Sequence, residues 1–178
     1  MKTRMLLCFF LFTFSQVSFS QSRSERKALK KEIETKAFEQ IKSLLDNGTF
    51  FFNATWMNPR NSNQINLINN PGFIKFKSNE EIDMYLPYFG IVRIGGGLNQ
   101  SVAIQYKGKL SSYEIVHNDA KRLSIISFTT NGPLERYDIT MKVSSTGYAS
   151  IYINSTKRDG IRYRGEITTF EDQSLTKH

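Results

Sequence analysis

Short runs in which apolar and polar residues alternate constrain the fold more than any other feature of this sequence. They begin near residue 50 and continue to residue 167, and the clearest one spans residues 136–143. Alternation with a period of two is typical of a β-strand with one buried face. Turn residues separate the runs, as in Asn-Gly-Pro at residues 131–133. The pattern predicts a mainly β domain of about eight or nine antiparallel strands, arranged as a sandwich or as a flattened barrel.

One helix is expected before the strands, over residues 21–47. Apolar residues recur there at every third or fourth position, and the resulting stripe consists of Leu29, Ile33, Ala37, Ile41 and Leu44. The remaining positions are mostly charged and mainly basic, so the helix is amphipathic. Gly48 follows the stripe and is a typical helix stop. Because the stripe begins at Leu29, we expect the helix to pack on the β domain from this residue onward.

The first twenty residues have the layout of a secretory signal peptide. Lys2 and Arg4 precede an apolar run over residues 5–14, and Ser18 and Ser20 are the small residues that a signal peptidase recognises. Cleavage is therefore expected after residue 20. The apolar run is about half as long as a membrane-spanning helix, which needs roughly 20 apolar residues. No transmembrane segment is expected in the mature chain.

The expected organisation has three parts. Residues 1–20 are the signal peptide, residues 21–47 form the basic amphipathic helix, and residues 48–178 form a single β domain. Export predicts a periplasmic or extracellular protein that is soluble or peripherally associated with the cell envelope. Cys8, the one cysteine, lies within the signal peptide, so the mature chain has no disulfide.

The chain is basic, with a formal net charge of +8 at pH 7. Lys2 and Arg4 contribute two of these charges, which leaves +6 after removal of the signal peptide. This charge favours an anionic component of the envelope as a partner, namely a lipid headgroup, lipopolysaccharide or an acidic glycan. Nucleic acid is not expected, because an exported protein rarely meets it. A basic surface that only keeps the protein soluble explains the charge as well.

Several short stretches resemble a known family. They are Asn-Gly-Thr-Phe-Phe-Phe-Asn-Ala at residues 47–54, Tyr-Leu-Pro-Tyr-Phe-Gly at 85–90, Ser-Tyr-Glu at 112–114, and the segments 147–150 and 161–167. With an export signal and a basic helix before them, they resemble the bacterial domain of unknown function numbered 4251, over about residues 25–170. The resemblance implies an exported β-rich domain and no particular activity. Some members look like lipoproteins, and this chain differs from them because it lacks a usable lipid-attachment cysteine.

Histidine and cysteine are too scarce for common metal or triad sites. His117 and His178 are the two histidines, whereas a zinc site usually needs three or four His, Cys or carboxylate ligands. We therefore expect no metal and no cofactor. A Ser-His-Asp triad would have to use His117. Asp119 is too close in sequence to orient this histidine, and no Gly-x-Ser-x-Gly motif is present.

Paired carboxylates are the enzymatic alternative, because glycoside hydrolysis requires two of them. The acidic residues that this alternative could use are Glu80, Glu81, Asp83, Glu114, Glu135, Asp138 and Glu166. Each is expected at a turn or on the polar side of a strand, where a solvated carboxylate is the simpler interpretation. The Gly-Gly-Gly run at residues 95–97 lacks the helix and the lysine of a phosphate-binding loop.

A ligand site, if there is one, is expected at Tyr88, Phe89 and Arg93. Pro87 should end the preceding strand because it cannot donate to a sheet ladder, and the two aromatic residues follow where the chain leaves the sheet. Two aromatic rings and one cation suit a ring-bearing or anionic ligand. In the competing interpretation, Tyr88 and Phe89 only close the end of the core.

The sequence as a whole favours an uncharacterised exported protein that is a non-catalytic binding module or an envelope-associated module. The alternative is a hydrolase that acts on envelope glycans through two carboxylates. No catalytic residue is predicted, and the sequence indicates neither a specific ligand nor an oligomeric state.

Overall fold

The structure, a computed structural model, describes residues 23–60, 63–89, 103–133 and 135–170. The chain divides into two compact units, residues 1–33 and 34–178. The expected signal peptide and the glycine run at residues 95–97 lie outside the described residues.

Helix α2 (Arg23–Asp46) is the N-terminal helix expected from the sequence. Its end is at the predicted place: Gly48 adopts a left-handed φ of 67°, and its backbone N–H donates to the carbonyl of Leu45 at 3.0 Å. Glycine accepts this conformation without steric cost. Among the described residues, no helix is long and apolar enough to cross a membrane.

The expected packing of α2 from Leu29 onward is wrong. Leu29 is 50% exposed and Ile33 is 59% exposed, whereas Phe38 and Leu45 are buried. The physical reason is the density of apolar side chains. Near Leu29 the stripe has one apolar residue per turn among charged neighbours, and burial of a single side chain per turn gains little free energy. From Ile41 onward two apolar residues share a turn, and Ile41, Leu44 and Leu45 pack on the core.

Among the described residues, ten strands follow the helix, all in antiparallel pairs. They are β1 (Phe50–Pro59), β2 (Ile65–Asn66), β3 (Gly72–Phe76), β4 (Glu81–Pro87), β5 (Ala103–Lys109), β6 (Ser112–Asn118), β7 (Leu123–Asn131), β8 (Arg136–Ser144), β9 (Tyr148–Ser155) and β10 (Ile161–Thr168). Side chains in β8, β9 and β10 alternate between buried and more exposed positions, as the period-two pattern predicted. The prediction of a mainly β, antiparallel fold with one N-terminal helix is confirmed.

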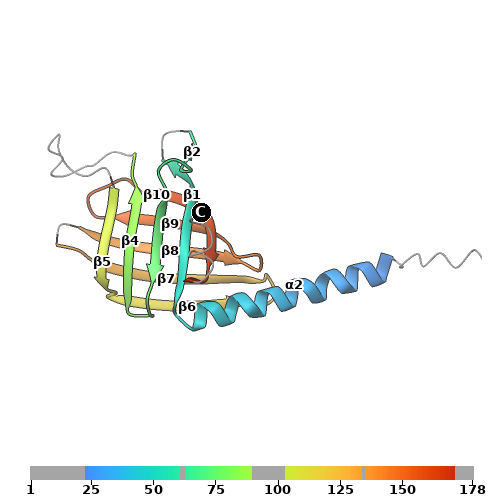
Figure 1. Cartoon of the computed structure of the whole chain (residues 1–178). Coiled ribbons are helices and arrows are strands. Elements are labelled where there is room, and N and C mark those ends of the chain that lie inside the picture. The colour runs from blue at the N-terminus through green and yellow to red at the C-terminus, as the bar shows by residue number, and fades with distance from the viewer. Residues whose placement is uncertain (1–22, 61–62, 90–102, 134, 171–178) are drawn as a thin grey trace, which may run out of the picture. The chain divides into compact units, whose positions relative to one another are not determined.

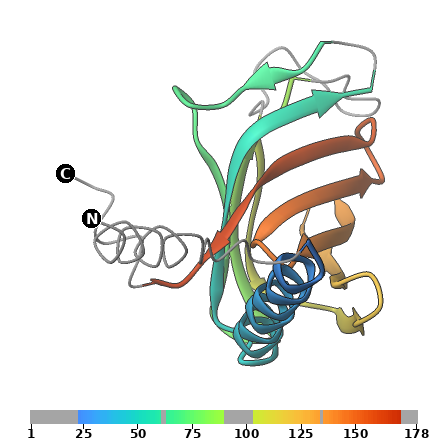
Figure 2. The same ribbon diagram turned by 90° about the vertical axis from the view of Figure 1, so that its right-hand side faces the viewer.

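The strands form one sheet in the order β5-β4-β3-β1-β10-β9-β8-β7-β6, and the short β2 pairs with β1. The sheet curls into a half-barrel, so that the strands of its two halves cross each other (Figure 1). Figure 2 shows the same curvature from the side, with β1 and β10 bending across the middle of the sheet. Of the two arrangements that the sequence left open, the structure is closer to the flattened barrel than to two separate sheets.

The curled sheet buries its inner face against itself. Phe76 of β3 stacks on Phe50 of β1 at 4.2 Å between ring centroids, and it meets the edge of Phe128 of β7 at 5.2 Å. β3 and β7 belong to opposite halves of the sheet, so this contact exists only because the sheet curls. Offset or edge-on aromatic pairs add about 0.5–1.5 kcal/mol beyond the burial of their area.

The bend between the two halves lies where β1 and β10 pair. The register shifts between Ala54 and Trp56, which marks a bulge in β1 at Thr55. Beside this bulge, β10 carries Gly165, which is paired with Ala54. A methyl group on Gly165 would overlap the carbonyl oxygen of Asn53. Glycine is therefore required here by the close approach of two backbones.

We expect Gly165→Ala to lower the free energy of unfolding by about 2 kcal/mol or more, because backbone atoms have to move apart to admit the methyl group. Chemical denaturation monitored by circular dichroism measures this change. Glu166→Ala, at the next and exposed position of β10, is the control, and it should stay within about 0.5 kcal/mol of wild type. Equal stability of the two variants would contradict this role of Gly165.

Candidate functional site

A cavity of about 240 Å³ lies where one edge of the curled sheet approaches the far side of the same sheet. Edge strand β5 contributes part of its wall, and the β7–β8 connection, β8 and the β9–β10 connection contribute the rest. The lining residues are Ala103, Gln105, Gly132, Pro133, Glu135, Tyr137 and Arg158. β5 and β6 are the two edges of the sheet, and in the described part of the chain they do not pair with each other.

A buried ion pair forms the polar part of the cavity wall. Arg158 Nε donates to Glu135 Oε1 at 2.8 Å, and the two side chains are only 9% and 8% exposed. Ser155 Oγ donates to the other carboxylate oxygen at 2.5 Å, and the Tyr137 hydroxyl donates to Oε1. Three donors thus hold one carboxylate, which is the arrangement that a buried charge needs.

These contacts keep Glu135 ionised. Burial raises the pKa of Glu135, but the hydrogen bonds from Ser155 and Tyr137 and the positive charge of Arg158 outweigh it, and the pKa lies below its usual value of 4.5. Burial, followed by the bond to the carboxylate, raises the pKa of Tyr137 above 10.0, so the hydroxyl stays protonated as a donor. Glu135 therefore carries a negative charge at neutral pH and has no proton to give.

Arg158 has one donor group without an acceptor. Its guanidinium lies 5.1 Å from the centroid of the Tyr88 ring, and its Nε serves Glu135. Nη1 is shielded from solvent and has no hydrogen-bond partner. A buried donor left unsatisfied costs about 1–3 kcal/mol. Because Arg158 lines the cavity, this donor is the group through which the residue could recognise an oxygen acceptor.

The residues predicted from the sequence lie partly beside this cavity. Tyr88 is buried at the end of the core, where its hydroxyl donates to the carbonyl of Asp159 at 3.2 Å and its ring supports Arg158. Phe89 is 50% exposed, and Arg93 lies outside the described residues. β4 ends at Pro87, as expected. The structure thus connects Tyr88 to the cavity through Arg158, a residue that the sequence does not single out.

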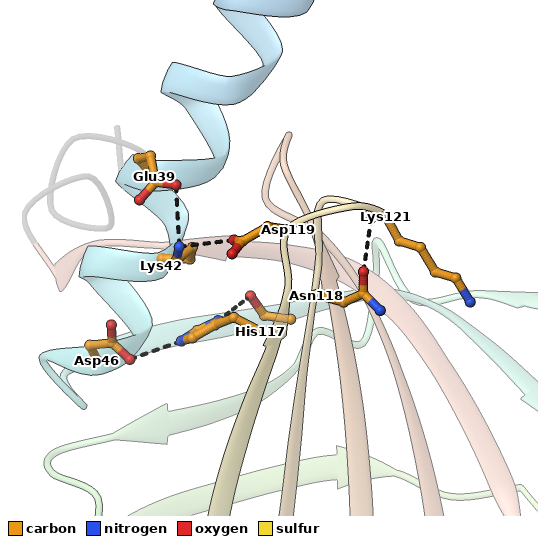
Figure 3. A network of polar contacts seen from close by, with 8 residues as sticks. Glu39, Lys42, Asp46, His117, Asn118, Asp119 and Lys121 are labelled. Carbon is orange, nitrogen blue, oxygen red and sulfur yellow. Dashed lines mark hydrogen bonds and ion pairs between the residues drawn. The ribbon is translucent and has the colours of Figure 1, made fainter.

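A chain of Ser, His and Asp side chains is present on the opposite part of the fold. Figure 3 shows His117 between helix α2 and the strands, with Nε2 3.0 Å from Asp46 Oδ1. Its Nδ1 lies 2.7 Å from Ser124 Oγ. In catalytic triads Nε2 faces the serine and Nδ1 faces the aspartate, whereas here the two nitrogens are exchanged. Ser124 is completely buried and cannot meet a substrate, so this chain of contacts is structural.

The same region fastens the end of the helix to the β6–β7 turn. Lys42 Nζ lies 3.0 Å from Asp119 Oδ1 and 3.2 Å from Glu39 Oε1 (Figure 3), and Arg122 Nη1 lies 2.6 Å from Glu34 Oε2. Solvent-exposed pairs of this kind contribute only about 0–1 kcal/mol each. The packed residues of α2 therefore contribute more to holding this part of the helix than the ion pairs do.

Metal ligands do not gather anywhere in the described part of the chain: no group of three His, Cys, Asp or Glu side chains there could hold a metal ion. The acidic residues considered for hydrolysis are also dispersed. Glu81 pairs with Lys77 at 2.7 Å and Asp138 with Arg136 at 2.9 Å, on exposed surfaces. Glu135 is expected to be solvated, but its side chain is buried, because the β7–β8 and β9–β10 connections enclose it.

A family model for the domain of unknown function DUF4251 matches residues 32–167. The chain belongs to this family. A crystal structure of a DUF4251 family protein from Bacteroides eggerthii superimposes on it with a TM-score of 0.61, at 13% sequence identity, over 80% of this chain and 94% of that one. At this identity the likeness concerns the fold alone. No curated protein matches this DUF4251 domain.

The lowered pKa of Glu135 predicts a particular dependence of stability on pH. A carboxyl whose folded-state pKa is depressed stabilises the folded state above its unfolded-state pKa, about 4.5, and this contribution is lost as the pH falls. Glu135→Gln should be less stable than wild type at pH 7, and the difference should shrink as the pH falls below about 4.5. Urea denaturation at several pH values measures it.

The matched control is Glu166→Gln on an exposed position of β10, which should keep the pH dependence of wild type. Part of the slope will remain in Glu135→Gln, because the Lys77 bond lowers the pKa of Glu81 and the Arg136 bond lowers that of Asp138. A constant difference between Glu135→Gln and wild type from pH 7 to pH 3 would contradict the assignment.

Proposed function

We propose that this DUF4251 domain is an exported, non-catalytic binding module whose ligand occupies the cavity beside Glu135 and Arg158. The observation that carries the proposal is that Arg158, a residue of the cavity wall, has a buried Nη1 donor without an acceptor. Export rests on the charge and apolar pattern of residues 1–20.

The chemistry of Glu135 favours binding over hydrolysis. Glycosidases use two carboxyl groups about 5–10 Å apart, and the one that acts as general acid has a raised pKa. Glu135 is the one carboxylate among the described lining residues. The three hydrogen-bond donors around it lower the pKa of Glu135 and occupy both of its carboxylate oxygens. It can position Arg158, but it is poorly suited to donate a proton.

The energetics of the ion pair support the same conclusion. Transferring two charges from water into a protein costs several kcal/mol per ion, and an apolar replacement of a buried pair is often neutral or stabilising. Stability alone therefore gives little reason for Glu135 and Arg158 at the rim of this sheet. Recognition of a ligand gives the pair a function that an apolar replacement would lack.

The proposal predicts that small compounds bind at the cavity. We would titrate ¹⁵N-labelled mature protein with a panel of amino sugars, uronic acids, dipeptides, aromatic acids and aromatic amides. At least one class should shift the backbone amide signals of Gly132 and Tyr137, with a Kd of about 1 mM or tighter. Arg158→Met should abolish these shifts, whereas Arg162→Met, the same change at an exposed arginine of β10, should not.

Arg158→Met leaves Glu135 as an unpaired buried charge and costs about 3–5 kcal/mol of stability. Ala103→Met therefore serves as a second variant, because it narrows the cavity from β5 without touching the ion pair. It should weaken binding while the protein remains folded. A panel without any binding compound, or binding that is unchanged in Ala103→Met, would refute this site.

A second candidate function is peripheral association with anionic lipid headgroups through the first part of α2. Every residue from 23 to 33 is exposed. This segment has five basic and two acidic side chains, and the basic ones are Arg23, Arg26, Lys27, Lys30 and Lys31. A basic residue close to an anionic membrane contributes about 1 kcal/mol of binding free energy. The net charge of the mature chain favours the same class of partner.

Cosedimentation with vesicles tests this second function. The mature protein should bind phosphatidylglycerol vesicles in low salt and release them in high salt. It should not bind phosphatidylcholine vesicles at either salt concentration. Replacing Arg26, Lys27, Lys30 and Lys31 by Gln should abolish binding. The control replaces Lys107, Lys109, Lys142 and Arg162, which are exposed on the sheet. Equal losses in the two variants would mean that net charge, and not the helix, is responsible.

A further inference from the structure

We infer that the cavity takes an uncharged group that presents an oxygen acceptor, such as an amide or carbonyl oxygen, to Arg158, and that it discriminates against anions. The inference rests on the proposed binding function and names the ligand class for that site. It reverses the expectation from net charge, which favoured an anionic partner.

The charge balance of the cavity wall is the first step. Among the described lining residues, the charged side chains are Glu135 and Arg158. Their ion pair at 2.8 Å brings one negative and one positive charge together. The positive charge of Arg158 is therefore already neutralised, although one of its nitrogens still has hydrogens to donate.

Two contributions to the binding free energy would be unfavourable for an anion in this site. Its desolvation costs far more than that of a neutral oxygen acceptor. It would also lie near the carboxylate of Glu135, and like charges at close range repel each other more strongly inside a protein than in water. A neutral carbonyl oxygen avoids both costs and can still accept a hydrogen bond from the guanidinium of Arg158.

The remaining wall of the cavity suits a small apolar body. Ala103, Gly132 and Pro133 have no polar side-chain atom, and Tyr137 adds an aromatic ring whose hydroxyl is already engaged with Glu135. The amide of Gln105, on β5, is the uncharged polar side chain of this remaining wall. A volume of about 240 Å³ lies below the usual range of drug-sized pockets, about 300–1,000 Å³. The fitting ligand is thus a compact apolar or aromatic group with one neutral oxygen acceptor.

Three probes of nearly equal shape test the inference: benzamide, benzoate and benzylamine. They are titrated at pH 7 into the ¹⁵N-labelled mature protein, and the amide shifts of Gly132 and Tyr137 report binding. Benzamide should bind wild type about tenfold more tightly than benzoate. Benzylamine, which has no oxygen acceptor, should also bind at least about tenfold more weakly than benzamide.

Glu135→Gln provides the discriminating variant. The amide oxygen of Gln can still accept hydrogen bonds from Tyr137 and Arg158, and its NH2 group can donate to the Ser155 hydroxyl in place of the bond that Oε2 accepted. The substitution removes the charge that neutralises the guanidinium. The preference should then change, with benzoate binding this variant at least as tightly as benzamide. A structural role of Glu135 alone would weaken both probes equally and would not change their ratio.

Two results would overturn the inference. If benzoate binds wild type as tightly as benzamide, the site does not select for neutral groups, although the binding module itself stands. An unchanged ratio of benzoate to benzamide affinity in Glu135→Gln would equally refute it. If none of the three probes binds and the wider panel is also inactive, the proposed function fails together with the inference.

Discussion

The curled sheet must bury its apolar face against itself, and the rest of the structure depends on this constraint. In the described part of the chain one sheet contains ten strands, and the last turns of α2 cover part of its core. No second sheet is present in the described part of the chain to cover the inner face. The bulge of β1 at Thr55 and the missing side chain of Gly165 allow the two halves to fold over each other. The bend brings β5 to the β7–β8 connection, and the cavity lies between them.

The direction of the strands and the identity of the inner face follow from the sequence, but the curvature does not. Period-two alternation tells which residues share a face, and β8 and β10 follow it closely. Whether two halves form separate sheets or one bent sheet depends on single positions such as Gly165, whose role becomes visible only with the partner strand in place. For the helix, the sequence predicts packing that the structure does not have. Its regular stripe begins at Leu29, but regular spacing does not say which residues find a packing partner.

The candidate site was harder to predict, because its charges come from two connections. Glu135 and Arg158 each lie next to turn residues in the sequence, where a solvated charge is the simpler interpretation. The β8–β9 register pairs Tyr137 with Ser155, and this pairing places Glu135 beside Ser155 and Arg158. The sequence predicts Tyr88 as a site residue because it is an aromatic residue at the end of a strand, but its contact with Arg158 is visible only once the connections are in place.

The measurement that tests the central claim most directly is side-chain NMR of Arg158. With ¹⁵N-labelled arginine, the Nη signals of Arg158 should shift when a binding compound is added, because the ligand oxygen becomes the acceptor that Nη1 lacks. The Nε signal, whose hydrogen already bonds to Glu135, should shift much less, and the exposed Arg162 should not respond. Shifts of the backbone around the cavity without any change at the Nη atoms of Arg158 would contradict the account.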